Sequence, residues 1–377
     1  MRARPLQAWF RPRRMVALAA LALTAAPAHA QQPASFDHAG LARRALEQHV
    51  RPGYGKLASS AANLSLTMSR FCAQQSASSR RTVDWAFDQL VDAWGSIDHI
   101  GFGPVTTDNR LERILFWPDR RGLGARQVSQ ALETRDPGVA DPQTLAGKSV
   151  ALQGLGALEI VLFSARTTED GEGKAHRCVF AEAIAANLAH MTKAVADEWS
   201  APDGFSRLWL TPGEMNPAFK TSAETTLELA KALDRGIERL RDEQIVGPLG
   251  LNAQRRKSPA IFNVSGRTMR AISAKAGGLL DLYTKGGIQQ AILAFGPAAG
   301  PKQTEFRKDA GAVSAELRRV RTITLALVPQ SRPFDDQKTA AWLIQTGFPL
   351  KNARFLASRL LHQTAGIPMG FTANDGD

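Results

Sequence analysis

Apolar residues recur three or four positions apart along most of the chain, which is the spacing of one face of an α-helix. The clearest stripe runs through Phe180, Ile184, Leu188, Met191, Val195 and Trp199. Similar stripes run from Phe87 to Ile97 and from Leu227 to Leu240. Further helices are expected at residues 38–51, 57–75, 109–116, 126–134, 144–164, 267–284, 303–327, 335–346 and 350–364. The best strand-like alternation, at 322–325, lies inside a helical context, so the sequence predicts an all-α protein.

Proline and glycine divide this helical pattern into two halves. The segment from Ser200 to Thr221 is rich in these residues and is predicted to be a long non-helical joint. We therefore expect an N-terminal helical half at 31–200, a linker at 201–221 and a C-terminal helical half at 222–377. Each half is long enough for a helical bundle.

The first 30 residues have the features of a signal peptide. Five arginines and no acidic residue precede an apolar run from Met15 to Ala26, and Ala28-His29-Ala30 supplies a small-residue cleavage site. The apolar run is too short to cross a membrane, which takes roughly 20 residues. We expect cleavage near Ala30, a mature chain without a transmembrane span, and a location in the periplasm or cell envelope.

The charge of the chain gives little support to a nucleic-acid partner. Lysine and arginine total 47 against 35 acidic residues, and removal of the signal peptide lowers the net charge from +12 to +7. The basic clusters that remain are short, as at Arg120-Arg121 and Arg318-Arg319, and have no aromatic residues interleaved as in single-strand binding grooves. We expect no nucleic-acid partner.

The chain has two cysteines, Cys72 and Cys178. This number excludes a disulfide-rich scaffold or a cysteine-rich metal module. In an oxidising compartment the two would form a natural pair. We predict a Cys72–Cys178 disulfide, and the alternative is two buried free thiols.

Several short segments, in order along the chain, resemble the imelysin-like family of exported bacterial helical proteins. They are Gly101-Phe102-Gly103-Pro104, Ile114-Leu115-Phe116-Trp117-Pro118, Gly154-Leu155-Gly156-Ala157-Leu158-Glu159, Arg177-Cys178 with the helix that follows, and Gly366-Ile367-Pro368-Met369-Gly370-Phe371. Together they cover roughly residues 40 to 377. The resemblance implies two helical domains, each similar to a four-helix bundle, with a site in the cleft between them. Some members of the family are described as peptidases and others as components of iron uptake.

The family signature is Gly-x-His-x-x-Glu, and this chain departs from it at one position. Gly154 and Glu159 match the signature, but Gly156 occupies the histidine position. A histidine and a glutamate three residues apart lie on one helix face and could share a metal ion. Because glycine offers no ligand or base, the change weakens the metallopeptidase and iron-site interpretations. A histidine from elsewhere in the fold, such as His99, could take its place.

Glu159 is still a candidate for function. Leu155 and Leu162 flank it on the helix face that we expect to be buried. A buried carboxylate needs a partner or a raised pKa. It could bind a cation or polar ligand in the cleft, or it could be a structural group paired with Arg110 or Arg113.

Polar residues near the Gly101–Pro104 break are weaker candidates. Asp98 and His99 follow an apolar stripe at a predicted helix end, where they could face the cleft, although a histidine at a helix end is more often a capping or surface group. Asn109 and Arg110 could form a polar cluster or simply cap a short helix.

The sequence thus predicts a non-enzymatic binding component linked to bacterial iron uptake. The candidate ligand-binding residues are Glu159, Gly156, Gly154, His99, Asp98, Asn109 and Arg110. No catalytic residue is assigned, and any metal ligands remain unknown. Iron and haem are the candidate cofactors, and the candidate partners are an iron species or an envelope iron-uptake protein. The alternatives are an imelysin-type peptidase and a structural partner of an envelope transporter.

Overall fold

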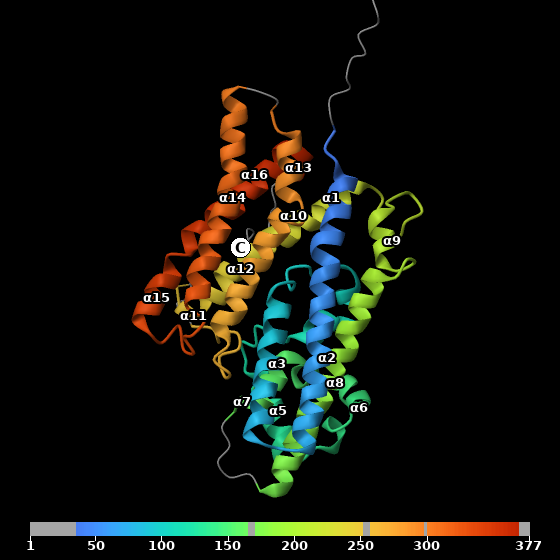
Figure 1. The fold of residues 1–377 in the computed structure, drawn as a ribbon, viewed down its shortest axis with the longest axis vertical. Helices are drawn as coiled ribbons and strands as arrows, with labels where there is room; N and C mark the ends of the chain where they lie inside the picture. The colour runs from blue at the N-terminus through green and yellow to red at the C-terminus, as the bar shows by residue number, and fades with distance from the viewer. Residues whose placement is uncertain (1–34, 165–169, 252–256, 298–299, 369–377) are drawn as a thin grey trace, which may run out of the picture. The chain divides into compact units, whose positions relative to one another are not determined.

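A computed structural model describes residues 35–164, 170–251, 257–297 and 300–368, and every regular element in these ranges is a helix (Figure 1). The α-helices are α1 (His38–Ala45), α2 (Arg51–Ala73), α3 (Ala77–Gly95), α4 (Arg110–Ile114), α5 (Leu123–Glu133), α6 (Pro142–Ala146), α7 (Gly154–Phe163), α8 (Gly171–Ser200), α9 (Phe205–Leu210), α10 (Ser222–Glu238), α11 (Gly247–Leu249), α12 (Thr268–Thr284), α13 (Ile288–Phe295), α14 (Pro301–Ala326), α15 (Gln337–Ile344) and α16 (Gly347–Ala365). Two π-helical segments, η1 (Leu46–Val50) and η5 (Arg239–Val246), continue α1 and α10, and η2 (Gly103–Asn109), η3 (Pro137–Val139) and η4 (Val150–Leu152) are 3₁₀ turns. The all-α prediction is confirmed.

The N-terminal helices pack around the long helices α2 and α8. These two run side by side, with α3 on α2 and α7 on α8 (Figure 1). The predicted disulfide is present and joins Cys72 of α2 to Cys178 of α8. Arg51, at the start of α2, also donates a hydrogen bond of 2.9 Å from Nε to the carbonyl oxygen of Trp199 near the end of α8. The disulfide and this hydrogen bond thus connect α2 to α8 near both ends of the pair.

The C-terminal helices form a second group, in which α14 packs against both α12 and α16 and α10 packs against α16 (Figure 1). The two groups meet where α12 lies against α3. All of these helices belong to one compact unit, Phe36–Asp377. The predicted domain boundaries and the four-helix-bundle character of each half therefore stay predictions.

Glycines set how closely α3 and α12 approach. A Cβ atom on Gly278 would lie 2.2 Å from the carbonyl oxygen of Ser96, and one on Gly95 would lie 2.9 Å from the Cβ of Ala274. The helix backbones therefore touch at this point, and a side chain at either glycine would force them apart.

Two local expectations were wrong. The single helix expected at 144–164 is broken into α6, η4 and α7, because Gly154 has a φ of +75° that a continuous right-handed helix does not allow. The 201–221 segment contains the helix α9 and is anchored by Trp209, whose buried indole donates a 2.9 Å hydrogen bond to the carbonyl oxygen of Ala42.

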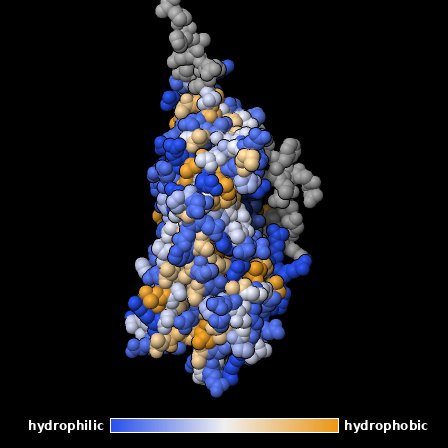
Figure 2. Space-filling model, turned by 90° about the vertical axis from the view of Figure 1, so that its right-hand side faces the viewer, coloured by the Kyte–Doolittle hydropathy of each residue, from blue (hydrophilic) through white to orange (hydrophobic). Residues whose placement is uncertain are grey.

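The predicted signal peptide and residues 369–377 lie outside the described residues. Figure 2 shows one face of the molecule, where hydrophilic side chains surround small, separate hydrophobic areas. No helix in the described part of the chain is long and apolar enough to cross a membrane.

Candidate functional site

Gly154 begins α7 with a backbone conformation that favours glycine. Besides its φ of +75°, a Cβ atom at this position would lie 2.3 Å from the carbonyl oxygen of Arg113 and 2.4 Å from that of Ile114. No side chain fits there without moving the backbone. Gly154 thus positions the start of α7 against the segment before it, which explains the glycine without a direct ligand contact.

Gly156, two residues further along α7, has free space around the position of a Cβ atom. A Cβ atom here would meet nothing closer than Leu115 Cδ1 and the carbonyl oxygen of Phe116, both at 3.9 Å. Gly156 lines a cavity of about 240 Å³ together with Glu159. The position of the family histidine is therefore open space at the cavity wall.

This cavity lies between parts of the chain that are distant in sequence. One wall consists of α7 and residues from the 115–125 segment, including Phe116 and Trp117, and the opposite wall is the 259–264 segment. Asp119 also lines it, but its two carboxylate oxygens accept hydrogen bonds of 2.8 and 2.7 Å from the backbone N–H groups of Leu123 and Gly124. The lining is mainly apolar and aromatic, with few polar groups, as in small-molecule sites.

Glu159 is buried and hydrogen-bonded. Its Oε1 accepts two bonds of 2.8 Å from Ser265, one from the backbone N–H and one from the hydroxyl. Burial raises the pKa of Glu159, while the Ser265 hydrogen bonds act in the opposite direction by stabilising the carboxylate. Glu159 thereby connects α7 to the loop before α12.

The expected arginine partners of Glu159 were wrong. Arg110 instead forms an ion pair of 2.6 Å with Glu198, and Arg113 donates from Nε to Gln153 Oε1 at 3.1 Å. The positive charge of Arg267 lowers the pKa of Glu159, but this effect is smaller than those of burial and of the Ser265 hydrogen bonds. A serine contributes the direct contacts because its hydroxyl and backbone N–H can reach one carboxylate oxygen together.

Asp98 and His99 are both buried, so the expectation that His99 caps a helix or lies on the surface was wrong. Both Asp98 oxygens accept hydrogen bonds of 2.9 Å from Lys275 Nζ on α12. His99 Nε2 lies 2.8 Å from His49 Nε2, so one imidazole donates and the other accepts. The Asp98–Lys275 ion pair therefore connects the N-terminal helix group to α12 of the C-terminal group. His99 forms its hydrogen bond with His49 of η1.

The structure does not bring all seven candidates together. Only Gly156 and Glu159 line the cavity beside α7, and Asp98 lines a neighbouring one. Asn109 is an exposed residue at the start of α4, with a φ of +54° and no capping bond from its side chain. Arg110 contributes its guanidinium to Glu198 and to a backbone carbonyl.

Sequence reasoning missed three partners of these residues: His49, Ser265 and Lys275. Lys275 could have been found, because it lies on the same helix face as the apolar residues Ile272 and Leu279, three and four positions away. A buried lysine needs an acidic partner. Ser265 lies in a loop, where no periodicity marks it.

Acid should weaken the fold through His49. Burial lowers the pKa of His49 from 6.5 to about 4, outweighing the raising effect of Asp281, while Lys285 also lowers it. Burial, His49 and Lys275 all lower the pKa of His99. As the pH falls below about 6.5, His49 takes up a proton in the unfolded chain but not in the folded one. Stability is therefore lost between about pH 6.5 and 4, by about 3 kcal/mol for His49 alone.

Urea unfolding of the wild type and His49→Gln at pH 7.5, 6, 5 and 4.5 would measure this effect. Because the carboxylates titrate in both proteins, the expected result is a difference in unfolding free energy between wild type and variant that changes as the pH falls. The variant should lose less stability than the wild type. Parallel curves would show that His49 does not control the acid sensitivity.

In the described parts of the chain, no group of three or more histidine, cysteine, aspartate or glutamate side chains is arranged to hold a metal ion. Glu159 has hydrogen-bond donors, rather than further metal-binding side chains, as its direct contacts. The candidate site is therefore a mainly apolar cavity with a buried carboxylate in its wall.

Comparisons with known proteins agree with this architecture. A crystal structure of an imelysin-like protein from Psychrobacter arcticum 273-4 superposes with a TM-score of 0.73 at 20% identity, covering 89% of this chain and 97% of that one. A "putative iron-regulated protein A precursor" from Parabacteroides distasonis ATCC 8503 gives a TM-score of 0.67 at 9% identity, covering 88% of this chain and 97% of that one. At these identities the likeness shows the fold alone.

No curated protein matches the chain significantly. The family model described as Peptidase_M75: Imelysin matches residues 50–346, which is most of the sequence. The chain belongs to the imelysin family.

Proposed function

We propose that this chain is an exported binding component of bacterial iron uptake, and that its ligand site is the cavity lined by Gly156 and Glu159. The observation that carries the proposal is the open space at Gly156, directly beside a buried carboxylate. The name of the Parabacteroides neighbour, which refers to iron regulation, supports the link to iron. The family name alone supports the peptidase alternative.

The groups in this cavity suit binding better than hydrolysis. A peptidase needs a base or a metal-activated water at the substrate. Gly156 provides neither, and Glu159 already accepts two hydrogen bonds from Ser265. A buried carboxylate among aromatic side chains can instead hold a cationic or hydrogen-bond-donating group of a ligand.

The size of the cavity favours a small iron species. Its volume of about 240 Å³ lies below the roughly 300–1,000 Å³ of pockets that enclose drug-sized molecules. A complete haem exceeds that space unless the 259–264 loop moves. We therefore expect ferrous or ferric iron to bind more readily than haem.

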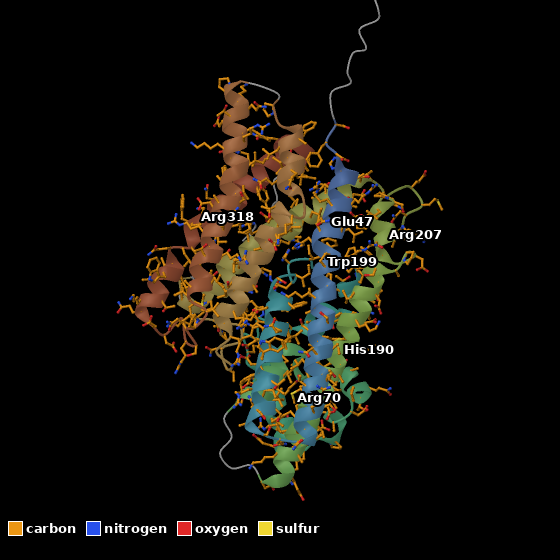
Figure 3. All side chains as sticks on the ribbon, in the orientation of Figure 1. Glu47, Arg70, His190, Trp199, Arg207 and Arg318 are labelled. Atoms are coloured by element: carbon orange, nitrogen blue, oxygen red, sulfur yellow. A yellow bond between two sulfur atoms is a disulfide. The ribbon has the colours of Figure 1, made fainter. Side chains whose placement is uncertain are left out.

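Glu159→Gln should reduce iron binding at least tenfold, because the amide keeps the shape of the side chain but removes its negative charge. Titration calorimetry of the mature protein with Fe²⁺ under anaerobic conditions, and with haem in parallel, would measure it. Glu47→Gln is the matched control, since Glu47 is exposed on η1 (Figure 3) and is not among the residues that line this cavity. An iron affinity that is equal in wild type and Glu159→Gln, or no iron binding by the wild type, would contradict the proposal.

Gly156→His should strengthen metal binding in this cavity by adding an imidazole ligand beside Glu159. The new imidazole would lie three residues before Glu159 on one face of α7, and Gly156 has room for a Cβ atom. We expect Co²⁺ to bind at least about tenfold more tightly, equivalent to about 1.4 kcal/mol. Absorption spectra of the Co²⁺ complex would detect nitrogen ligation, with Gly156→Ala as the control. Equal affinities in the histidine and alanine variants would show that residue 156 does not face the carboxylate.

A further inference from the structure

A separate pocket of about 320 Å³ lies between α10 and α16, which pack against each other in the C-terminal helix group (Figure 1). It is larger than the cavity at Glu159 and shares no lining residue with it. Its volume falls within the roughly 300–1,000 Å³ that is typical of small-molecule sites. The pocket is therefore large enough to hold a ligand of its own.

Small residues on the two helices leave the space for this pocket. Ala230 lines it from α10, and Ala357 and Ser358 line it from α16. Larger side chains at these positions would fill the gap between the packed helices. The chain just beyond α16 adds Ile367 and Pro368 to the wall.

Part of the apolar wall of the pocket is accessible to solvent. Leu227 and Ala230 are half-buried and Pro368 is exposed, whereas Leu233 and Ile237 in the same wall are almost fully buried. A hydrocarbon group that covers the accessible residues would remove apolar surface from water, which is favourable. The pocket thus suits a ligand with an apolar body.

Two of the three cations in the wall, Arg354 and Lys231, already have carboxylate partners. Arg354 donates from Nε and Nη2 to the two carboxylate oxygens of Asp234, at 2.8 and 2.9 Å, and forms an ion pair of 3.3 Å with Glu238. Lys231 forms an ion pair of 2.8 Å with Glu228. These two cations need no further counter-charge.

Arg235 is the third cation, and no carboxylate among the described residues pairs with it. Its side chain is exposed, so its guanidinium is accessible to a ligand in the pocket. A guanidinium presents parallel N–H donors that match the two oxygens of a carboxylate. The pocket therefore combines accessible apolar surface with one cation that lacks a partner.

We propose that this pocket binds a small amphipathic monocarboxylate, with its hydrocarbon chain between α10 and α16 and its carboxylate on Arg235. The chain covers Leu227, Ala230 and Pro368, and the guanidinium of Arg235 donates to both carboxylate oxygens. One unpaired guanidinium balances one negative charge, so a monocarboxylate matches the pocket better than a dianion. Octanoate has both features and serves as the probe.

Titration with octanoate, followed by the methyl signals of isoleucine-labelled protein, tests the proposal. Ile367→Val would assign the signal of Ile367, which should move saturably with octanoate. Hexanoate should bind at least about fivefold more weakly, because each buried methylene raises the affinity about fourfold. Octanol keeps the chain but has no charge, and it should also bind at least about fivefold more weakly than octanoate.

Arg235→Gln tests the contact with the carboxylate, because glutamine stays polar but carries no charge. This variant should lose the preference for octanoate over octanol. Arg207→Gln is the matched control and should keep the wild-type affinity, since Arg207 is also exposed (Figure 3) and does not line the pocket. Ala230→Phe should weaken the binding of both ligands, because the larger side chain takes up space in the pocket.

Three results would overturn the proposal. The first is an Ile367 signal that octanoate does not move, or moves without saturation. The second is an equal octanoate affinity in the wild type and Arg235→Gln. The third is binding that is detected only after residues 369–377 are removed, because the pocket would then be occupied by this segment and not by a carboxylate ligand.

This inference does not rest on the proposed iron site. Glu159→Gln should leave the octanoate titration unchanged, and Arg235→Gln should leave iron binding unchanged. Failure of either proposal is therefore distinguishable from failure of the other.

Discussion

Lys275→Met is expected to lower the free energy of unfolding by about 3–5 kcal/mol, because it leaves the Asp98 carboxylate buried without its counter-charge. The side chain of Lys275 is 1% exposed and that of Asp98 is 8% exposed, so bulk water reaches the Asp98 carboxylate too little to replace the ammonium group. Burial lowers the pKa of Lys275, and the adjacent Asp98 carboxylate opposes that effect. Urea unfolding followed by circular dichroism would measure the change.

Two variants make this experiment specific. Lys275→Met combined with Asp98→Asn removes both charges and should recover more than half of the lost stability. Lys193→Met breaks an exposed ion pair with Asp197 and should change stability by at most about 1 kcal/mol. A loss at Lys275 no larger than the loss at Lys193 would show that the buried pair contributes little.

Removal of the Cys72–Cys178 disulfide should cost about 4 kcal/mol. The bond closes a loop between residues 106 positions apart, and in the chain-entropy model a loop of about 100 residues corresponds to nearly 5 kcal/mol, of which native proteins often realise less. Thermal unfolding of Cys72→Ala/Cys178→Ala, compared with the oxidised wild type, would measure the loss.

Reduced wild-type protein serves as a second comparison, because it lacks the bond but keeps both sulfur atoms. It should unfold at nearly the same temperature as the double variant. If only the double variant is destabilised, packing at the two positions accounts for the loss and the covalent link does not.

Much of the fold could be predicted from the sequence, because each long helix buries a regular apolar face. The stripe from Phe180 to Trp199 lies within α8, and the 303–327 prediction coincides with α14 to within two residues. Helix ends that fall within apolar stretches were harder to predict. Residues 144–164 are apolar enough for one helix, and only the tertiary contact at Gly154 shows why α7 must begin there.

The candidate site was predicted less completely, because contacts between distant segments leave no pattern in the sequence. The helix face of Glu159 was predicted correctly to be buried, yet its partner is a loop serine 106 positions away. The position of His99 after a helix suggested a capping or surface group. Its burial against His49 depends on how η1 packs, which the sequence does not reveal.

The close contact between α3 and α12 has a consequence for the order in which the chain can fold. Asp98 and Lys275 are 177 positions apart, so the face of α3 that receives α12 is synthesised long before its partner. Until α12 emerges, Gly95 at the end of α3 and the Asp98 carboxylate just after it have no partner from α12. The α2–α8 pair can assemble in the meantime, since both helices lie before residue 201. We expect the nascent protein to pass through a stage in which the N-terminal helices are assembled and the α3 surface is open to chaperones.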